Sequence, residues 1–279
     1  MMETFLIAFV LFFFWHNLGT SIGYHRLLTH KAVQCFKPVE YFFVIGGYLC
    51  LEGSPVWWVT MHRAHHRYSD TDLDPHTPRK GIKFAYNGWL GKRDYPPHLD
   101  PKVQAADVLR DPLYRFLEQD GHLRNASKLC FWSNIALRVI FLFTLGPAVA
   151  GASFLAAALA HQCPLIINTV CHLPKRFGYK NFETRDDSVN VGWLSLITVG
   201  ESWHNNHHTF PGSARFGLKK NEFDLSWLVL KLLEKCGLVK KLYEPKIKFT
   251  HDFQLKPEHL LDPAALMPEE TESTVALAN

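Results

Sequence analysis

The chain has 279 residues, of which 47% are hydrophobic, 14% aromatic and 20% charged. This share of bulky apolar side chains excludes a disordered chain, and a net charge of +4 is too small to indicate nucleic-acid binding. The six cysteines form no C-x-x-C pair, so a disulfide scaffold is not expected. The sixteen histidines stand out against this ordinary composition and need an explanation.

Two apolar blocks are long enough to cross a membrane. Residues 4–24 carry no charged side chain and would span about 30 Å as a helix, the thickness of a bilayer core. No basic segment precedes this block and no small-residue cleavage site follows it, so we expect a retained helix rather than a signal peptide. Residues 129–171 carry a single charge, Arg138, and suit a helical hairpin with spans at 129–147 and 150–172. The sequence therefore predicts an all-α membrane protein with three spans.

The distribution of lysine and arginine predicts how these spans are oriented. The first 24 residues and the hairpin turn contain none, whereas residues 61–128 contain twelve and residues 173–279 fourteen. The positive-inside rule then places residues 25–128 and 173–279 in the cytoplasm. The apolar segment 41–51 is too short to cross and is expected to be interfacial or re-entrant.

The end of the chain adds one more helix to the predicted cytoplasmic part. Residues 222–236 have the pattern of an amphipathic helix that Gly237 can end. Residues 263–279 are expected to form a loose acidic tail. Because no internal repeat or linker divides the chain, we expect residues 1–279 to form a single domain.

Eight histidines fall into three clusters whose spacing suits one face of a helix. They are His25 and His30; His62, His65 and His66; and His204, His207 and His208. Imidazole is a ligand for iron, zinc and copper, and no cysteine in the clusters favours a structural zinc site. All three clusters lie on the same predicted side of the membrane, so we expect them to share a metal site. Most other histidines are expected to have ordinary roles, and His16 lies too far along its span to join the site.

Longer motifs surround these clusters and carry a family resemblance. They read Gly23-Tyr-His-Arg-Leu-Leu-Thr-His30, Trp58-Val-Thr-Met-His-Arg-Ala-His-His66, Asp72-Leu-Asp-Pro-His76 with Arg79-Lys-Gly81, and His204-Asn-Asn-His-His-Thr-Phe-Pro211. In this order around apolar blocks, they resemble the membrane fatty-acyl desaturases, and within them the delta-9 type acyl-CoA and acyl-lipid group. The resemblance covers nearly the whole chain.

The resemblance implies two irons held by nine histidines and, through water, one asparagine. Eight of the histidines would be those of the three clusters. The ninth would be His172 and the asparagine Asn168, from Asn168-Thr-Val-Cys-His172. If the ninth ligand lies elsewhere, His76 and His161 are the next candidates.

The resemblance also implies the partners of the reaction. The substrate would be a fatty acyl chain on coenzyme A, acyl-carrier protein or a lipid, with dioxygen as the co-substrate. The chain lacks a His-Pro-Gly-Gly haem motif and carries no haem or flavin, so electrons would come from an external donor such as ferredoxin or a cytochrome with its reductase. Family members usually have another helix before the first histidine-bearing span, and only 24 residues precede His25, so one span is expected to be missing. The small size and missing cytochrome favour a bacterial plasma membrane over the endoplasmic reticulum.

Several other side chains are candidates for supporting roles. A ligating imidazole usually donates its second N–H to an acceptor, and the carboxylate candidates are Asp70, Asp74, Asp187 and Glu201. Tryptophans could line an acyl tunnel or anchor the protein at the membrane interface, and the candidates are Trp57, Trp58, Trp89 and Trp193. Arg79 could meet a phosphorylated head group or belong to an ordinary basic loop.

Removal of hydrogen from an unactivated methylene requires an oxidant stronger than any side chain, and a metal pair with dioxygen can supply it. Neutral histidines would stabilise the ferric state less than carboxylate ligands, which is one source of oxidising power. The sequence predicts a desaturase that introduces a cis double bond, but leaves a hydroxylase, acetylenase or alkane-oxidising relative open. A metal transporter is a more remote alternative, because transporter ligands usually lie inside the spans.

Overall fold

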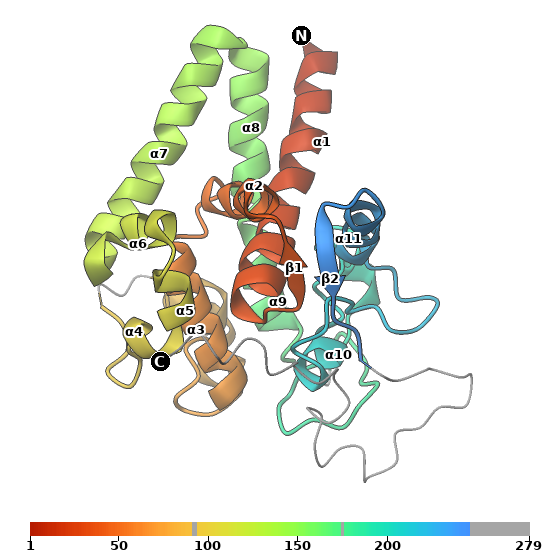
Figure 1. Ribbon diagram of the computed structural model, residues 1–279. Helices are drawn as coiled ribbons and strands as arrows, with labels where there is room; N and C mark the ends of the chain where they lie inside the picture. Colours follow the sequence, from red (N-terminus) through yellow and green to blue (C-terminus); the bar gives the residue numbers. More distant parts are fainter. Residues whose placement is uncertain (91–93, 174–175, 246–279) are drawn as a thin grey trace.

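The computed structural model describes residues 1–90, 94–173 and 176–245. The tail predicted at 263–279 lies outside these residues. Three long helices rise side by side above a lower part built from shorter helices and loops (Figure 1). The N-terminus and the turn between the second and third long helices lie at the same end, opposite the lower part. The protein is therefore mostly helical and has two differently built regions, an apolar stem and a lower part.

The three long helices are apolar enough to cross a membrane, which confirms the predicted number of spans. The first runs over Met2–Thr29 and consists of α1 (Met2–Leu18) and a π-helical continuation, η1 (Gly19–Thr29). The second is α7 (Leu123–Thr144). The third runs over Pro147–Val170 and comprises α8 (Pro147–Ala160) and α9 (Gln162–Val170).

The helix ends differ from the predicted span ends in an informative way. The first helix does not stop at Tyr24 but continues to Thr29, so His25 lies on the helix rather than after it. The second begins at Leu123, six residues earlier than predicted. Its first turns contain polar residues, and a prediction based on apolar residues alone does not include them in the helix. Gly146 ends the hairpin turn with a positive φ of 87°, a conformation that favours glycine.

A short helix, α2 (Lys37–Tyr48), lies beside the junction of α1 and η1 in the first long helix (Figure 1). Its twelve residues are too few to cross a membrane, in agreement with the prediction for 41–51. It packs against η1 through backbone, since a Cβ added at Gly19 would lie 2.3 Å from the nitrogen of Gly47. Glycine at this crossing therefore allows α2 and η1 to approach closely.

The lower part carries the remaining elements. They are the strand β1 (Val33–Cys35), the helices α3 (Pro55–Tyr68), η2 (Pro78–Lys80), η3 (Phe84–Gly88), α4 (Pro101–Gln104), α5 (Ala106–Leu109), α6 (Pro112–Glu118), η4 (Gln119–Gly121), η5 (Gly192–Leu194), α10 (His204–Thr209) and α11 (Leu225–Lys235), and the strand β2 (Val239–Leu242). The two strands pair antiparallel, with Val33 opposite Leu242. Asp224 caps α11 by accepting from the Trp227 backbone N–H, so the helix predicted at 222–236 forms but begins at residue 225.

One buried charge joins the two regions. Arg138 of α7 donates to the side-chain oxygen of Asn134 at 2.8 Å and to the carbonyl of Leu49 at 2.7 Å. Leu49 follows the last residue of α2, where the helix dipole and free carbonyls favour a cation. The charge inside the span is thus paired with protein rather than lipid.

Candidate metal centre and adjoining cavity

The three histidine clusters converge between η1, α3 and α10. Pro55 begins α3 and Ser54 caps it, accepting from the Trp57 N–H at 3.1 Å, which fixes the helix that carries His62, His65 and His66. The π-helical winding of η1 carries His25, and His30 follows at its end. The short helix α10 carries the third cluster. His172 joins them from two residues beyond the end of α9.

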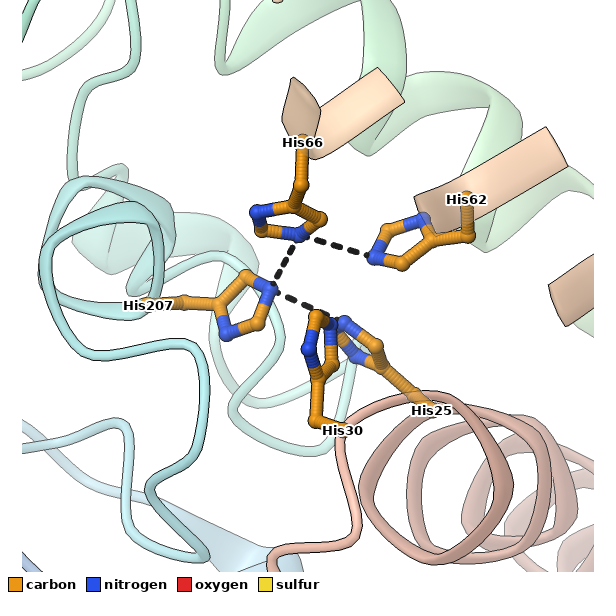
Figure 2. Close-up of side chains that lie close together, drawn as sticks. All are labelled: His25, His30, His62, His66 and His207. Atoms are coloured by element: carbon orange, nitrogen blue, oxygen red, sulfur yellow. Dashed lines mark hydrogen bonds between the residues drawn. The ribbon is translucent and has the colours of Figure 1, made fainter. Parts of the chain in front are cut away.

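The first group contains five histidines: His25, His30, His62, His66 and His207. Figure 2 shows their rings pointing toward a common centre from three separate segments. The Nε2 atom of His207 lies 2.9 Å from that of His25 and 2.9 Å from that of His66. The Nε2 atoms of His66 and His62 are 3.1 Å apart. One nitrogen of each ring lies within 4.8 Å of the corresponding nitrogen of the others, a spacing that could hold a metal ion.

The second group contains four histidines, His65, His172, His204 and His208. The Nε2 atoms of His172 and His204 are 3.0 Å apart. The two groups adjoin, since the rings of His66 and His208 have centroids 4.4 Å apart. Tertiary structure therefore brings together all nine histidines expected from the sequence, as a five-histidine group beside a four-histidine group.

The protonation pattern of these rings tests whether a metal fits. The Nδ1 atoms of His65 and His208 face the carboxylates of Asp74 and Asp186 and donate to them, so the Nε2 atom of each ring carries a lone pair. Both Nε2 atoms are buried and without a hydrogen-bond partner among the described residues. A buried acceptor without a partner is costly. Both rings belong to the four-histidine group, and a metal cation at its centre would meet these lone pairs. In the five-histidine group the Nε2 atom of His30 is likewise buried without a partner among the described residues, so each group fits a metal.

The spacing of the nitrogens gives the same result. Two nitrogens bound at right angles to one ion, each about 2.1 Å away, lie about 3.0 Å apart. The contacts between Nε2 atoms in the two groups measure 2.9 to 3.1 Å. The imidazoles are thus already spaced as neighbouring ligands of one ion.

Burial keeps most of these rings neutral, the form that binds metal. Removal from water lowers the pKa of His62, His66, His204 and His207 well below the ordinary histidine value. Burial also lowers the pKa of His208, to about 4, although the Asp186 carboxylate opposes the shift. These five rings therefore present unprotonated nitrogens at neutral pH.

Three of the four predicted carboxylates contact histidine rings. Asp70 accepts from His172 at 2.9 Å, Asp74 from His65 at 3.1 Å, and Glu201 from His25. Burial raises the pKa of Asp70, but the hydrogen bond and charge of His172 outweigh it and lower the value to about 2. For Glu201 the charges of His25 and Arg26 outweigh burial in the same way, again giving a pKa of about 2. Both groups are carboxylates at neutral pH.

The side chain of the fourth predicted carboxylate, Asp187, pairs with no histidine among the described residues. Its side chain pairs with Arg79 at 2.8 Å, whereas its neighbour Asp186 accepts from His208 at 2.7 Å. Asp186, which the sequence did not single out, is thus the aspartate of this pair whose carboxylate faces a histidine. Nothing in two adjacent aspartates of a loop indicates which of them does so. The guanidinium of Arg79 donates to the Asp187 carboxylate, so Arg79 already has an ion-pair partner within the protein.

A cavity of about 240 Å³ adjoins the histidines. Its wall includes His25, His62 and His204 at the metal centre, and Asn168 of α9. Three of the four predicted tryptophans, Trp57, Trp58 and Trp89, also line it. Trp193 does not line it: the side chain is 65% exposed, which contradicts a place in an enclosed tunnel.

The tryptophan walls are fixed by stacking. Trp57 and Trp89 stack with centroids 5.5 Å apart, and Trp58 stacks on the ring of His62 at 4.7 Å. Glu52, which the sequence did not single out, accepts from Trp58 Nε1 and from His161 Nδ1, both at 3.1 Å. The only sequence signal for Glu52 was an acidic residue at the end of an apolar segment.

The remaining candidate histidines occupy separate places. His161 lies on the cavity wall with Glu52, outside the two groups. His76 lines the cavity and adjoins the four-histidine group through His65, whose ring centroid lies 4.2 Å from its own with the planes tilted. His16 binds the carbonyl of Gly46 at 2.7 Å and joins neither group, as expected from its position on the span.

Comparison with known proteins agrees with this geometry. The family model for fatty acid desaturases matches residues 3–223. The chain belongs to the fatty acid desaturase family. It is 37% identical to the sn-1 stearoyl-lipid 9-desaturase of Anabaena variabilis over 83% of this chain and 81% of that protein. The acyl-CoA C20 Delta5-desaturase of Anemone leveillei is 35% identical over 87% and 75%, and the Delta-9 acyl-lipid desaturase 1 of Arabidopsis thaliana 35% over 80% and 70%.

These relatives decide between the functional alternatives. All three are named as desaturases, and none as a hydroxylase or a transporter. The protein is a membrane fatty acid desaturase, and its buried histidines form a site suited to metal. The alternatives that the sequence left open are not favoured.

Proposed function

We propose that this desaturase removes two hydrogens from adjacent methylenes of an acyl chain and leaves a cis double bond. The oxidant is dioxygen, and two electrons and two protons complete its reduction to two molecules of water. The observation that carries the proposal is a cavity whose wall includes tryptophans and three histidines of the two groups. A chain threaded past Trp58 would present its methylenes to the metal centre beside His25, His62 and His204.

We infer that the centre holds two irons. His25, His30, His62, His66 and His207 would hold one, and His65, His172, His204 and His208 the other. Asn168 would bind a water that completes the second site. When bound, the iron pair supplies the activation of dioxygen and the abstraction of hydrogen. The protein's part is to fix the imidazoles, to keep them unprotonated and to enclose the acyl chain away from bulk water.

The relatives' names suggest the reaction's position and carrier. Two of the three compared are named as 9-desaturases that act on lipids, so we propose the same position and carrier class here. The coenzyme A ester and the Delta5 position of the Anemone protein are the alternatives. A separate carrier protein, a ferredoxin or a cytochrome with its reductase, would deliver the electrons.

The proposed orientation places the metal centre in the cytoplasm. Support comes from the stem, whose N-terminus and hairpin turn share the end opposite the histidines (Figure 1). Lysine and arginine are absent from that end and abundant in the lower part. A reporter fused after Asp120 should be cytoplasmic, and an extracytoplasmic signal would reject the topology. We propose a bacterial plasma membrane as the location.

Lipid analysis of a host that expresses the chain tests the proposed reaction. New monounsaturated fatty acids should accumulate. Mass spectrometry of their adducts with dimethyl disulfide should place the double bond at carbon 9. Oxygenated acids would instead indicate a hydroxylase. His122→Ala is a matched control, because His122 is exposed and lies outside both groups. An unchanged lipid profile with a suitable electron donor present would contradict the proposal.

A further inference from the structure

The two histidine groups differ in the charge around them. In the four-histidine group, three rings donate to carboxylates: His65 to Asp74, His172 to Asp70 and His208 to Asp186. In the five-histidine group, the only hydrogen bond to a carboxylate among the described residues is that of His25 with Glu201. The outer negative charge is therefore distributed unequally between the two sites.

The difference in outer charge between the two groups is increased by a cation beside Glu201. Glu201 is ion-paired with the fully buried guanidinium of Arg26, so its negative charge is neutralised locally. In the described part of the chain, no lysine or arginine side chain forms an ion pair with Asp70, Asp74 or Asp186. The other hydrogen-bond partners of the Asp70 and Asp186 carboxylates are neutral: Asp70 accepts from the Thr77 hydroxyl and the Asp187 N–H, and Asp186 from Ser188. The Lys180 ammonium donates instead to the backbone carbonyl of Asp186, at 2.8 Å.

These three carboxylates, which form no ion pair with lysine or arginine among the described residues, would act on the metal through the imidazoles. A carboxylate that accepts from Nδ1 makes Nε2 a more basic ligand and fixes its orientation. Added negative charge near an ion in a buried site stabilises the higher oxidation state of that ion more than the lower. Asp70 and Asp74 are almost completely buried, so water screens their charges little.

We propose that Asp70, Asp74 and Asp186 make the four-histidine site the tighter and lower-potential of the two iron sites. Its ion is held longer against a chelator and is the last to be reduced when electrons arrive. Asp186 is a positioning residue that acts through His208. The inference rests on the proposed di-iron function, to which it adds an order of binding and reduction.

Chelator release from purified protein that holds two irons tests the order of binding. Wild-type protein should lose one iron quickly and the second slowly. Asp186→Asn keeps an oxygen that can accept from His208 but removes the charge, and should accelerate the slow phase by about 10- to 100-fold. Asp187→Asn is the matched control, since the Asp187 side chain pairs with Arg79 and with no histidine in the described part of the chain, and both phases should keep their rates. Asp186→Glu should restore the slow phase in part.

A redox titration followed by Mössbauer spectroscopy tests the order of reduction. Two ferric-to-ferrous transitions are expected, and Asp186→Asn should raise only the lower potential. Loss of both irons in one phase from the wild type, equal effects of the two asparagine variants, or movement of the upper transition would overturn the inference. If Asp186→Asn does not accumulate as folded protein, Asp74→Asn makes the same prediction through His65. Absence of metal from active protein would instead reject the proposed di-iron site itself.

Discussion

The apolar stem and the histidine-bearing lower part are held together by different interactions. Large apolar side chains cover the outside of the stem, such as Phe143 at 82% exposure, where lipid is the expected neighbour. Where the first long helix meets the lower part, buried charges contact residues distant in sequence, and Arg26 with Glu201 and Asp224 is an example. Substitutions on the lipid-facing stem should therefore be tolerated, whereas substitutions in the lower part should act over long range.

The largest effect is expected where the lower part carries chemistry. His65→Ala and His207→Ala should each abolish desaturation, because each removes one nitrogen from a metal group, while neither residue lies in a span. Lipid analysis of the host gives the activity, and membrane fractionation shows whether insertion is retained. More than a few per cent of wild-type product from either variant would contradict the ligand assignment.

His172 and Asn168 should separate a direct ligand from a water-mediated one. His172→Ala is expected to lose about one iron per chain and all activity, since its ring belongs to the four-histidine group. Asn168→Ala is expected to keep most of the iron and lose much of the rate, because a contact through water contributes less than a direct bond. Metal analysis and turnover measured together distinguish them. Wild-type metal and rate in both would place the ninth ligand elsewhere, with His76 the next to examine.

Glu201 joins the site to the surrounding fold. Its carboxylate accepts from Ser21 at 2.6 Å and pairs with both His25 and Arg26. Glu201→Gln would leave the buried guanidinium of Arg26 without its nearest counter-charge, and removal of one partner of a buried pair costs about 3–5 kcal/mol. We expect a clearly lower thermal unfolding temperature in detergent together with weaker iron binding. Wild-type thermal stability would show that Asp224 alone compensates Arg26.

The smallest effect is expected on the lipid-facing side of the stem. Phe143→Leu keeps an apolar side chain at an exposed position of α7, so thermal stability and product yield should stay close to wild type. Gly19→Ala, on the face of the first helix that meets α2, should instead reduce accumulation, because the added methyl group would overlap the backbone of Gly47. Comparable yields of the two variants would contradict the close packing of α2 on η1.

The comparison also explains how far the sequence could predict the structure. The spans and the histidine clusters follow from local rules: apolar length, and three- or four-residue spacing on one face of a helix. The helix ends were less accurate, since η1 continues as a π-helix to Thr29 beyond the apolar block. Hydropathy measures the preference of side chains for lipid. It does not show at which residue the backbone hydrogen bonds of a helix end.

The sequence by itself determined which residue types could bind metal and which segments could cross a membrane. Only the tertiary structure decided that the nine histidines divide into five and four, because the division depends on how η1, α3 and α10 converge. It also decided that Asp186 faces His208 while Asp187 faces Arg79, and that Trp193 is exposed and does not line the cavity. The physical reason is the same in each case. The direction of a side chain in an irregular segment is fixed by contacts with residues distant in sequence, and the local sequence does not indicate which residues these are.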